Sequence, residues 1–181
     1  GKSLGSGFRG LDFTSASDEV NLGNALAYER TDTFSGFALI VPAATAAAIL
    51  VGKLNTAAWP GWRFGLTAAL KPYLDLRNSG GRCMTQSTAA ITDATLTMVG
   101  WTYTGSSTVA GITLYKDGAV FADTDQNDTL AAGTIIDTTA LTIGALVGGA
   151  DYRGDIGLVA VFGAAKTAAD FTRWAALARL I

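Results

Sequence analysis

The residue types that carry most enzyme chemistry are scarce in this chain. It has no histidine and one cysteine, Cys83. Without an imidazole base, neither a serine nor a cysteine nucleophile can be activated in the usual pairing. Glycoside hydrolysis needs two carboxylates at a fixed separation. Asp75, in segment 72–77, has no acidic residue two or four positions away. We therefore expect a protein that is not an enzyme, and a Cys83 that is a small buried hydrophobe.

The densest run of oxygen donors is DTDQND, with Asp123, Asp125, Asn127 and Asp128. Calcium prefers oxygen ligands, and this run places ligand types at the first, third and fifth positions of an EF-hand loop. It departs from that loop because Asp128 replaces the glycine. We take these four residues as the candidate metal site, and calcium is the one cofactor considered. The alternative is a polar loop after a hairpin, whose side chains cap turns.

Two further pairs of oxygen donors are secondary calcium candidates, Asp18 with Asn21 and Asp151 with Asp155, and both are more simply explained as turn formers.

Aromatic side chains in turns suggest a contact surface for sugars. Trp59 and Trp62 bracket a Pro-Gly turn, and Tyr152 and Arg153 lie in a glycine-rich loop. An exposed aromatic ring offers an apolar face on which a sugar ring can stack, next to side chains that can form hydrogen bonds. We therefore name these four residues as candidate ligand-binding residues. The alternative is that Trp62 and Tyr152 close the ends of a core, where we also expect Trp101 and Trp174.

Composition limits the classes of protein that this chain can be. Of its 181 residues 49% are hydrophobic and 15% are charged, with a formal net charge of −2. This balance predicts a large core and gives no basic patch for nucleic acid. The apolar stretch 37–52 is shorter than the roughly 18–20 residues of a membrane span. We expect a flexible segment or linker over 1–10 and one domain over 11–181.

The candidate residues must be held in place by strands, turns and a helix, and the sequence predicts several of these elements. The 22 glycines fit a fold with many tight turns. Lys116-Asp117-Gly118 joins two short apolar runs, which is a strong signal for a type I′ hairpin. The segment 167–180 is the one expected helix, with a capping box at Thr167 and Asp170. Its apolar residues at spacings of three predict a buried stripe, namely Phe171, Trp174, Leu177 and Leu180.

The expected strands have no helices alternating with them, which excludes a doubly wound parallel sheet. They are 34–41, 49–54, 63–67, 72–77, 96–103, 112–115, 119–122, 141–144 and 157–162.

Three segments in order resemble the concanavalin A-like lectin/glucanase superfamily, in its laminin-G-like branch. They are LDF and DEVNLGNALAYERTDTFSGFALIV within 11–41, LTMVGWTYTGSSTVAGITLYKDGAV over 96–120, and LTIGALVGGADYRGDIGLVAVFGAAKTAADFTRW over 141–174. The sequences NALAYERTDTFS and YTGSSTVAGITLY are similar to the corresponding segments of bacteriophage tail and other virion proteins.

This resemblance implies an all-β fold, a two-sheet antiparallel jelly-roll sandwich with one short C-terminal helix. The glucanase branch carries a Glu-x-Asp-x-(x)-Glu pattern, and neither Glu19 nor Glu29 lies in one. Our first hypothesis is a non-enzymatic virion component of a bacteriophage, a tail-fibre, spike or capsid-decoration domain in a homo-oligomer. The second is a secreted carbohydrate-binding adhesion module, and the third is an unusual glycoside hydrolase.

The partners expected under the first two hypotheses are other virion proteins, copies of the chain itself and cell-surface glycans. We expect no nucleic acid partner and no membrane insertion. The expected location is the virion, with secretion as the alternative. A surface with few long charged side chains suits close packing against other chains.

Overall fold

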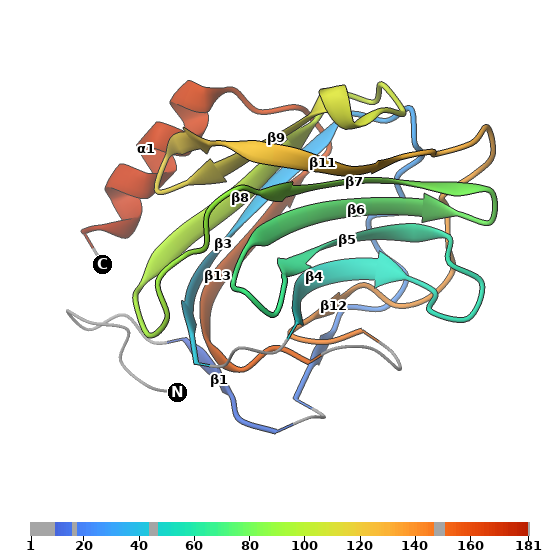
Figure 1. Ribbon diagram of the computed structural model, residues 1–181. Helices are drawn as coiled ribbons and strands as arrows, with labels where there is room; N and C mark the ends of the chain where they lie inside the picture. Colours follow the sequence, from blue (N-terminus) through green and yellow to red (C-terminus); the bar gives the residue numbers. More distant parts are fainter. Residues whose placement is uncertain (1–9, 16–17, 44–46, 147–150, 181) are drawn as a thin grey trace.

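The computed structural model describes residues 10–15, 18–43, 47–146 and 151–180. Its chain forms two antiparallel sheets of six and seven strands that pack face to face, with one α-helix against the smaller sheet (Figure 1). The all-β sandwich expected from the sequence is confirmed. The expected flexible segment 1–10 falls outside the described residues, except for Gly10.

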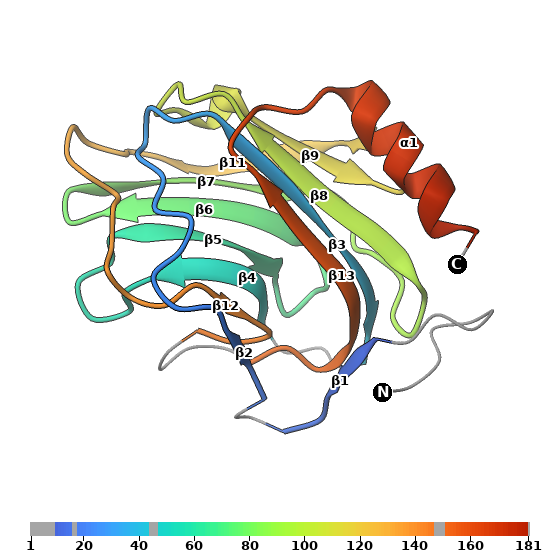
Figure 2. The ribbon, with the colours of Figure 1, turned by 180° about the vertical axis from the view of Figure 1, so that it is seen from behind.

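The six-stranded sheet has the order β1-β13-β3-β8-β9-β10. The two strands in the middle of this order are buried because they lie between the core and the helix (Figure 2). The strands are β1 (Leu11–Phe13), β3 (Phe34–Pro42), β8 (Thr97–Tyr103), β9 (Ile112–Lys116), β10 (Ala119–Phe121) and β13 (Gly154–Phe162).

The seven-stranded sheet has the order β11-β7-β6-β5-β4-β12-β2. Three consecutive hairpins connect β4 to β7, so the middle of this sheet is a simple meander. The strands are β2 (Val20–Asn21), β4 (Ala48–Leu54), β5 (Gly61–Leu66), β6 (Pro72–Asn78), β7 (Gly81–Ser87), β11 (Asp123–Asp128) and β12 (Thr142–Ile143).

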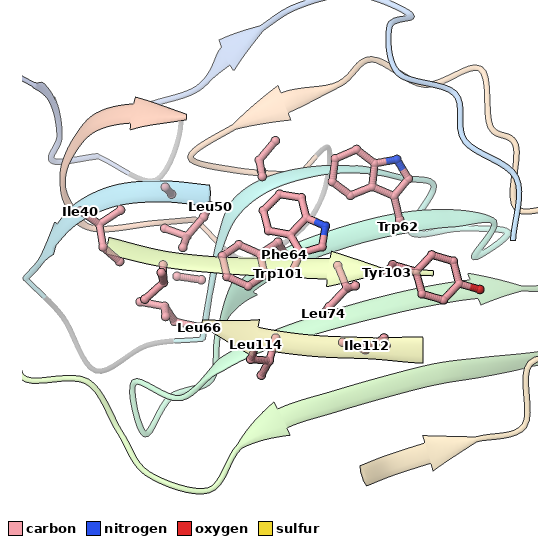
Figure 3. Close-up of a cluster of buried hydrophobic side chains, with 14 of the residues drawn as sticks. Ile40, Leu50, Trp62, Phe64, Leu66, Leu74, Trp101, Tyr103, Ile112 and Leu114 are labelled. Atoms are coloured by element: carbon pink, nitrogen blue, oxygen red, sulfur yellow. The ribbon is translucent and has the colours of Figure 1, made fainter. Parts of the chain in front are cut away.

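The core lies between the two sheets and is rich in aromatic rings (Figure 3). Trp62 and Phe64 of β5 meet Trp101 of β8, with ring centroids 6.0 Å and 4.5 Å apart. Period-two alternation along β5 sends these rings inward and the residues between them outward. Cys83 is fully buried in the same core, as expected.

The β9–β10 hairpin turns at Asp117 and Gly118, as predicted. Both residues have positive φ, 49° and 86°, which is what a type I′ turn requires. The Asp117 carboxylate accepts a hydrogen bond from the backbone N–H of Met98 at 3.0 Å. A Cβ at Gly118 would lie 2.8 Å from the Cα of Thr172, so the turn also needs glycine to pack against the helix.

The helix α1 (Ala168–Ala178) begins with the predicted capping box. Thr167 Oγ1 accepts from the backbone N–H of Asp170 at 3.3 Å, and the Asp170 carboxylate accepts from the N–H of Thr167 at 2.9 Å. Neither α1 nor the 3-10 turn η1 (Val109–Gly111) is long and apolar enough to cross a membrane, and the described residues contain no other helix.

The predicted stripe on α1 is correct only at its start. Phe171 is fully buried and Trp174 is half-buried, whereas Leu177 and Leu180 are 60% and 83% exposed. Three residues cover about 300° of an α-helix, so each step of three turns the stripe about 60° away from the sheet. Ala175 therefore takes the buried place that was expected of Leu177.

Candidate functional site

The outer face of the seven-stranded sheet, turned away from the core, carries an unusual group of charges. In β5, Arg63 lies between the core residues Trp62 and Phe64 and therefore points outward. The register pairs Arg63 directly with Asp75 of β6. The next outward position of β6 is Arg77, which pairs with Arg82 of β7. Three of the chain's eight arginines thus meet beside one carboxylate.

Asp75 holds the three guanidinium groups together. Its Oδ2 accepts from Arg63 Nε at 2.9 Å, from Arg77 Nε at 2.8 Å and from Arg82 Nη2 at 3.1 Å. Its Oδ1 accepts from Arg82 Nε at 2.7 Å. The Asp75 side chain is fully buried, so these charge-assisted hydrogen bonds replace all of its water. We expect the cluster to be rigid, because each guanidinium is fixed by at least one of these bonds.

The cluster carries more positive charge than Asp75 neutralises. Three arginines against one aspartate leave a net charge of +2 on this part of the sheet. The Arg63, Arg77 and Arg82 side chains are 18%, 16% and 27% exposed, so their outer edges reach solvent. Burial lowers the pKa of Arg77, and Asp75 partly offsets this, but a guanidinium stays protonated in proteins.

Trp59 stands at the rim of this cluster. The Arg77 guanidinium lies over its indole ring, 4.6 Å from the centroid, and the side chain is still 44% exposed. Its turn is fixed by Asn55, whose Oδ1 accepts from the N–H groups of Ala57 and Ala58 and whose carbonyl accepts from the Trp59 N–H at 2.7 Å. Trp59 itself has a φ of 68°, an uncommon value for a bulky residue.

We call Trp59, Arg63, Asp75, Arg77 and Arg82 the arginine face. A second layer of buried apolar residues supports it from the same side of the sheet, namely Ile49, Leu54, Tyr73, Met84 and Leu146. The Arg63 guanidinium lies over the Tyr73 ring at 5.6 Å. The arrangement offers several fixed N–H donors and one exposed aromatic ring on the same face of the sheet.

Of the four predicted ligand-binding residues, only Trp59 lies in this face. Trp62 is 1% exposed and donates from its indole nitrogen to the Leu26 carbonyl at 3.3 Å. Tyr152 is also 1% exposed and donates to the Asp155 carbonyl at 3.3 Å, and burial raises its pKa. Trp62 and Tyr152 therefore match the alternative expectation of closing the ends of the core, because both rings are buried and their polar atoms are bonded inside the protein.

Arg153 lies at a different place from Trp59. It precedes β13 of the six-stranded sheet and donates to the Thr14 carbonyl. With Asp12, Asp155 and neighbouring residues it lines a hollow of about 440 Å³ at the β1 edge of that sheet. Trp59 belongs to the turn before β5 in the other sheet. The structure therefore does not bring the two remaining predicted residues into one site.

The predicted metal residues form a strand rather than a loop. Asp123 to Asp128 make β11, an exposed edge strand paired with β7 through a bulge between Asp125 and Asn127. The Asp128 carboxylate accepts from the Val109 N–H at 3.1 Å. Along a strand, successive side chains point to opposite faces and so do not converge on one ion. Among the described residues no group of three or more acidic, cysteine or histidine side chains is placed to hold a metal ion.

The two glutamates have structural surroundings. The Glu29 carboxylate accepts from the Thr134 hydroxyl and from the N–H groups of Arg30 and Ile135. Burial raises the pKa of Glu29, but these hydrogen bonds outweigh it and hold the pKa below its ordinary value. Glu29 thus ties the segment around Ile135 to the chain near Arg30, while Glu19 is exposed.

The arginine face was not predicted from the sequence, although a signal for it was present. Arg63 and Asp75 each lie between two apolar core residues, as Asp75 does between Leu74 and Leu76, whereas Arg77 and Arg82 each adjoin only one. A residue between two core residues of a strand points outward, and the predicted strands 63–67 and 72–77 are close enough in the sequence to form a hairpin that places Arg63 near Asp75. The expectation for Asp75 concerned an acidic partner two or four positions away, whereas its partners are basic and lie on the neighbouring strands.

Comparisons with known proteins give structural likeness without sequence likeness. No protein family model matches the chain, and the search of curated proteins finds no match. Many solved structures are similar in fold. The carbohydrate-binding module CBM40 of the Ruminococcus gnavus IT-sialidase, solved with α2,3-sialyllactose bound, has a TM-score of 0.63 at 12% identity. The match covers 92% of this chain and 95% of the module.

Two further solved structures have a similar fold. The SAP-like pentraxin of Limulus polyphemus, a heptamer, has a TM-score of 0.62 at 12% identity, over 92% of this chain and 80% of the pentraxin. A K499G mutant of the NanB sialidase of Streptococcus pneumoniae has a TM-score of 0.69 at 12% identity, over 91% of this chain and 27% of the sialidase. These likenesses support the predicted concanavalin A-like jelly-roll sandwich as the fold.

Proposed function

We propose that this domain is a non-catalytic carbohydrate-binding module, and that it binds glycan on the arginine face. The observation that carries the proposal is the exposed ring of Trp59, fixed by its turn beside the fixed guanidinium groups of Arg77 and Arg82. An aromatic ring for stacking together with convergent polar donors is the usual composition of a small-ligand site. The shared fold with a carbohydrate-binding module supports the proposal without deciding it.

The absence of catalysis is part of the same proposal. The arginine face pairs one carboxylate with three arginines, and Asp75 is fully buried. Its oxygens are occupied by hydrogen bonds and cannot reach a glycosidic oxygen or a water molecule. The retaining and inverting mechanisms that use an acid–base pair of carboxyl groups require two accessible ones about 5–10 Å apart. A reducing-sugar assay with soluble polysaccharides should therefore show no release above a heat-denatured control.

The test of the proposal is binding of the full chain to a broad glycan array, repeated with Trp59→Ala. We expect the wild-type domain to bind a defined subset of glycans and Trp59→Ala to lose that signal while keeping its fold by circular dichroism. Arg173→Gln is the control, because Arg173 is exposed on α1, which packs against the six-stranded sheet, whereas the arginine face lies on the seven-stranded sheet. No binding on the array, or unchanged binding by Trp59→Ala, would count against the proposal.

A structural role in a self-assembling particle, such as a virion, is our second candidate, and the observation that bears on it is a different surface suited to self-association. An apolar groove lies between α1 and the six-stranded sheet, where Leu158 and Leu177 are 45% and 60% exposed beside the half-buried Trp174. Apolar side chains that stay exposed together suit an interface with another copy of the chain. The similar structures named above include no virion protein. Light scattering after size exclusion tests this candidate: a stable oligomer that Leu177→Asp makes monomeric would support it, and a monomer at all concentrations would oppose it.

A further inference from the structure

The arginine face has a pronounced chemical bias that the proposed function does not yet explain. A site for neutral sugars needs hydrogen-bond donors and acceptors in similar numbers, because each hydroxyl group is both. Here the three arginines are donors only, and the one acceptor, Asp75, is buried and already receives four hydrogen bonds. The face therefore offers donors and positive charge, and it lacks a carboxylate acceptor for a sugar hydroxyl.

Asp75 leaves several guanidinium donors of these arginines unused. Arg63 and Arg77 each bond Asp75 through Nε alone, so their Nη1 and Nη2 atoms have no acceptor among the described residues. Arg82 bonds Asp75 with Nε and Nη2 and approaches the sulfur of Met84 with Nη2, which leaves its Nη1 without an acceptor there. An Nη1/Nη2 edge is the side of a guanidinium that binds a carboxylate or a sulfate with two parallel hydrogen bonds.

Burial of Asp75 fixes these edges before a ligand arrives. The flexible arginine side chain normally loses rotamer freedom when it binds, and this loss weakens association. In this site the central carboxylate, the Trp59 ring and the Tyr73 ring already hold the guanidinium groups. The local net charge of +2 then attracts an anion, although the whole chain has a net charge of −2. The attraction is confined to this face, which argues against long polyanions such as nucleic acid.

We infer that the arginine face binds an acidic saccharide, with the anionic oxygens of the sugar against the free Nη1/Nη2 edges of Arg63 and Arg77 and the free Nη1 of Arg82, and the sugar ring beside Trp59. A carboxylate and a sulfate share the required chemistry, and the experiment below separates them. The inference rests on the proposed glycan-binding function and names the class of glycan.

The experiment uses the full chain and three probes with a common neutral part: lactose, 3′-sialyllactose and 3′-sulfolactose, within the array of neutral and acidic glycans. We expect at least one acidic probe to bind about tenfold more tightly than lactose, which corresponds to one good charge-assisted contact. Raising the NaCl concentration should weaken this binding and leave weak lactose binding unchanged, because salt screens exposed charges. Preference for one acidic probe identifies carboxylate or sulfate as the anion.

Variants assign the effect to these arginines. Arg82→Gln should reduce the acidic preference about tenfold, and Arg82→Lys should fall between it and the wild type, since lysine keeps the charge but loses the guanidinium edge. Arg173→Gln on α1 removes a charge outside the face and should change nothing. If Arg82→Gln fails to fold by circular dichroism, Arg63→Lys keeps the charge of the cluster and should still lower the preference.

The outcomes separate the two proposals. Tight binding of neutral glycans with no acidic preference, lost in Trp59→Ala, would keep the proposed function and overturn the inference. Equal binding of poly-glutamate and of the acidic glycans would also overturn it, because the site would then recognise charge without sugar. No binding of any glycan would contradict both the proposed glycan-binding function and the inference of an acidic saccharide.

Discussion

The guanidinium of Arg77 lies 4.6 Å from the centre of the Trp59 indole ring and also donates to the buried Asp75. Trp59 comes from the turn between β4 and β5, whereas Arg77 comes from β6, so this contact joins a surface turn to the middle of the sheet. A cation over an indole at an exposed site contributes about 0.5–1 kcal/mol. Through it the rigid charge cluster fixes an exposed aromatic ring, which is the relationship that the proposed binding site depends on.

Asp75→Asn should strongly destabilise the protein. The substitution removes the negative charge that three partly buried arginines share, and removing one partner of a buried ion pair costs about 3–5 kcal/mol. Urea unfolding followed by tryptophan fluorescence measures the change in the free energy of unfolding. Asp93→Asn, at an exposed aspartate, is the matched control and should stay within about 0.5 kcal/mol of the wild type. A small effect of Asp75→Asn would mean that the cluster is not held by its carboxylate.

Trp59→Ala should leave stability nearly unchanged. Its ring is 44% exposed and, among the described residues, contacts the Arg77 guanidinium and no other aromatic ring, so we expect a loss of about 1 kcal/mol or less. Trp62→Ala, in the core, should cost about 3–5 kcal/mol because it leaves a large cavity. Thermal unfolding of the two variants under one buffer checks the contrast, and equal losses would contradict the assignment of Trp59 to the surface.

The capping box of α1 predicts a dependence of stability on acid pH. Hydrogen bonds from the Thr167 N–H and hydroxyl lower the pKa of Asp170 below its ordinary value of 3.8. The unfolded chain therefore binds this proton at a higher pH than the folded chain, so the stabilisation is present above about pH 4 and is lost as the pH falls through the folded pKa. Asp170→Asn should be less stable than the wild type at neutral pH, and the difference should disappear towards pH 2. A difference that stays constant with pH would contradict this account.

Cys83 should not react with thiol reagents in the folded protein. Its side chain is fully buried, and burial raises the pKa of the thiol to about 12. The reactive thiolate is therefore both scarce and inaccessible at pH 8. We expect 5,5′-dithiobis(2-nitrobenzoic acid) to release no chromophore from the native protein and one equivalent after unfolding in guanidinium chloride. Fast reaction of the native protein would place Cys83 at the surface.

Local chemistry made part of this fold predictable from the sequence. The Asp117-Gly118 turn and the Thr167 capping box each depend on a few adjacent residues, and both are confirmed. The strand β11 was expected to be a loop, because six polar residues give no apolar alternation; its hydrogen bonds with the edge of β7 decide its structure. Propensity cannot reveal such a strand, since its partner is about 40 residues away in the sequence.

The candidate site was harder to predict because it exists only in the register of three strands. Trp59 was found from its turn, where local sequence is sufficient. Arg63, Arg77 and Arg82 come from β5, β6 and β7 and share a site only because Asp75 lies between them in the sheet. For Trp62 and Tyr152 both a contact role and burial at the end of the core were expected as alternatives, because an aromatic residue near a turn has the same local sequence signal whether it points outward or inward. Burial in this sandwich is set by the opposite sheet, which the local sequence does not show.

The most direct test of the account is a nuclear magnetic resonance titration of the ¹⁵N-labelled full chain with the best acidic glycan from the array. Trp59 is the one exposed tryptophan, so its indole N–H signal reports on the arginine face, and the Nε–H signals of Arg63, Arg77 and Arg82 report on the anion. We predict that these signals shift together and saturate with one affinity, while the Arg153 and α1 signals stay fixed. Shifts confined to Arg153 and the β1 edge, with Trp59 and the three arginines unchanged, would contradict the central claim.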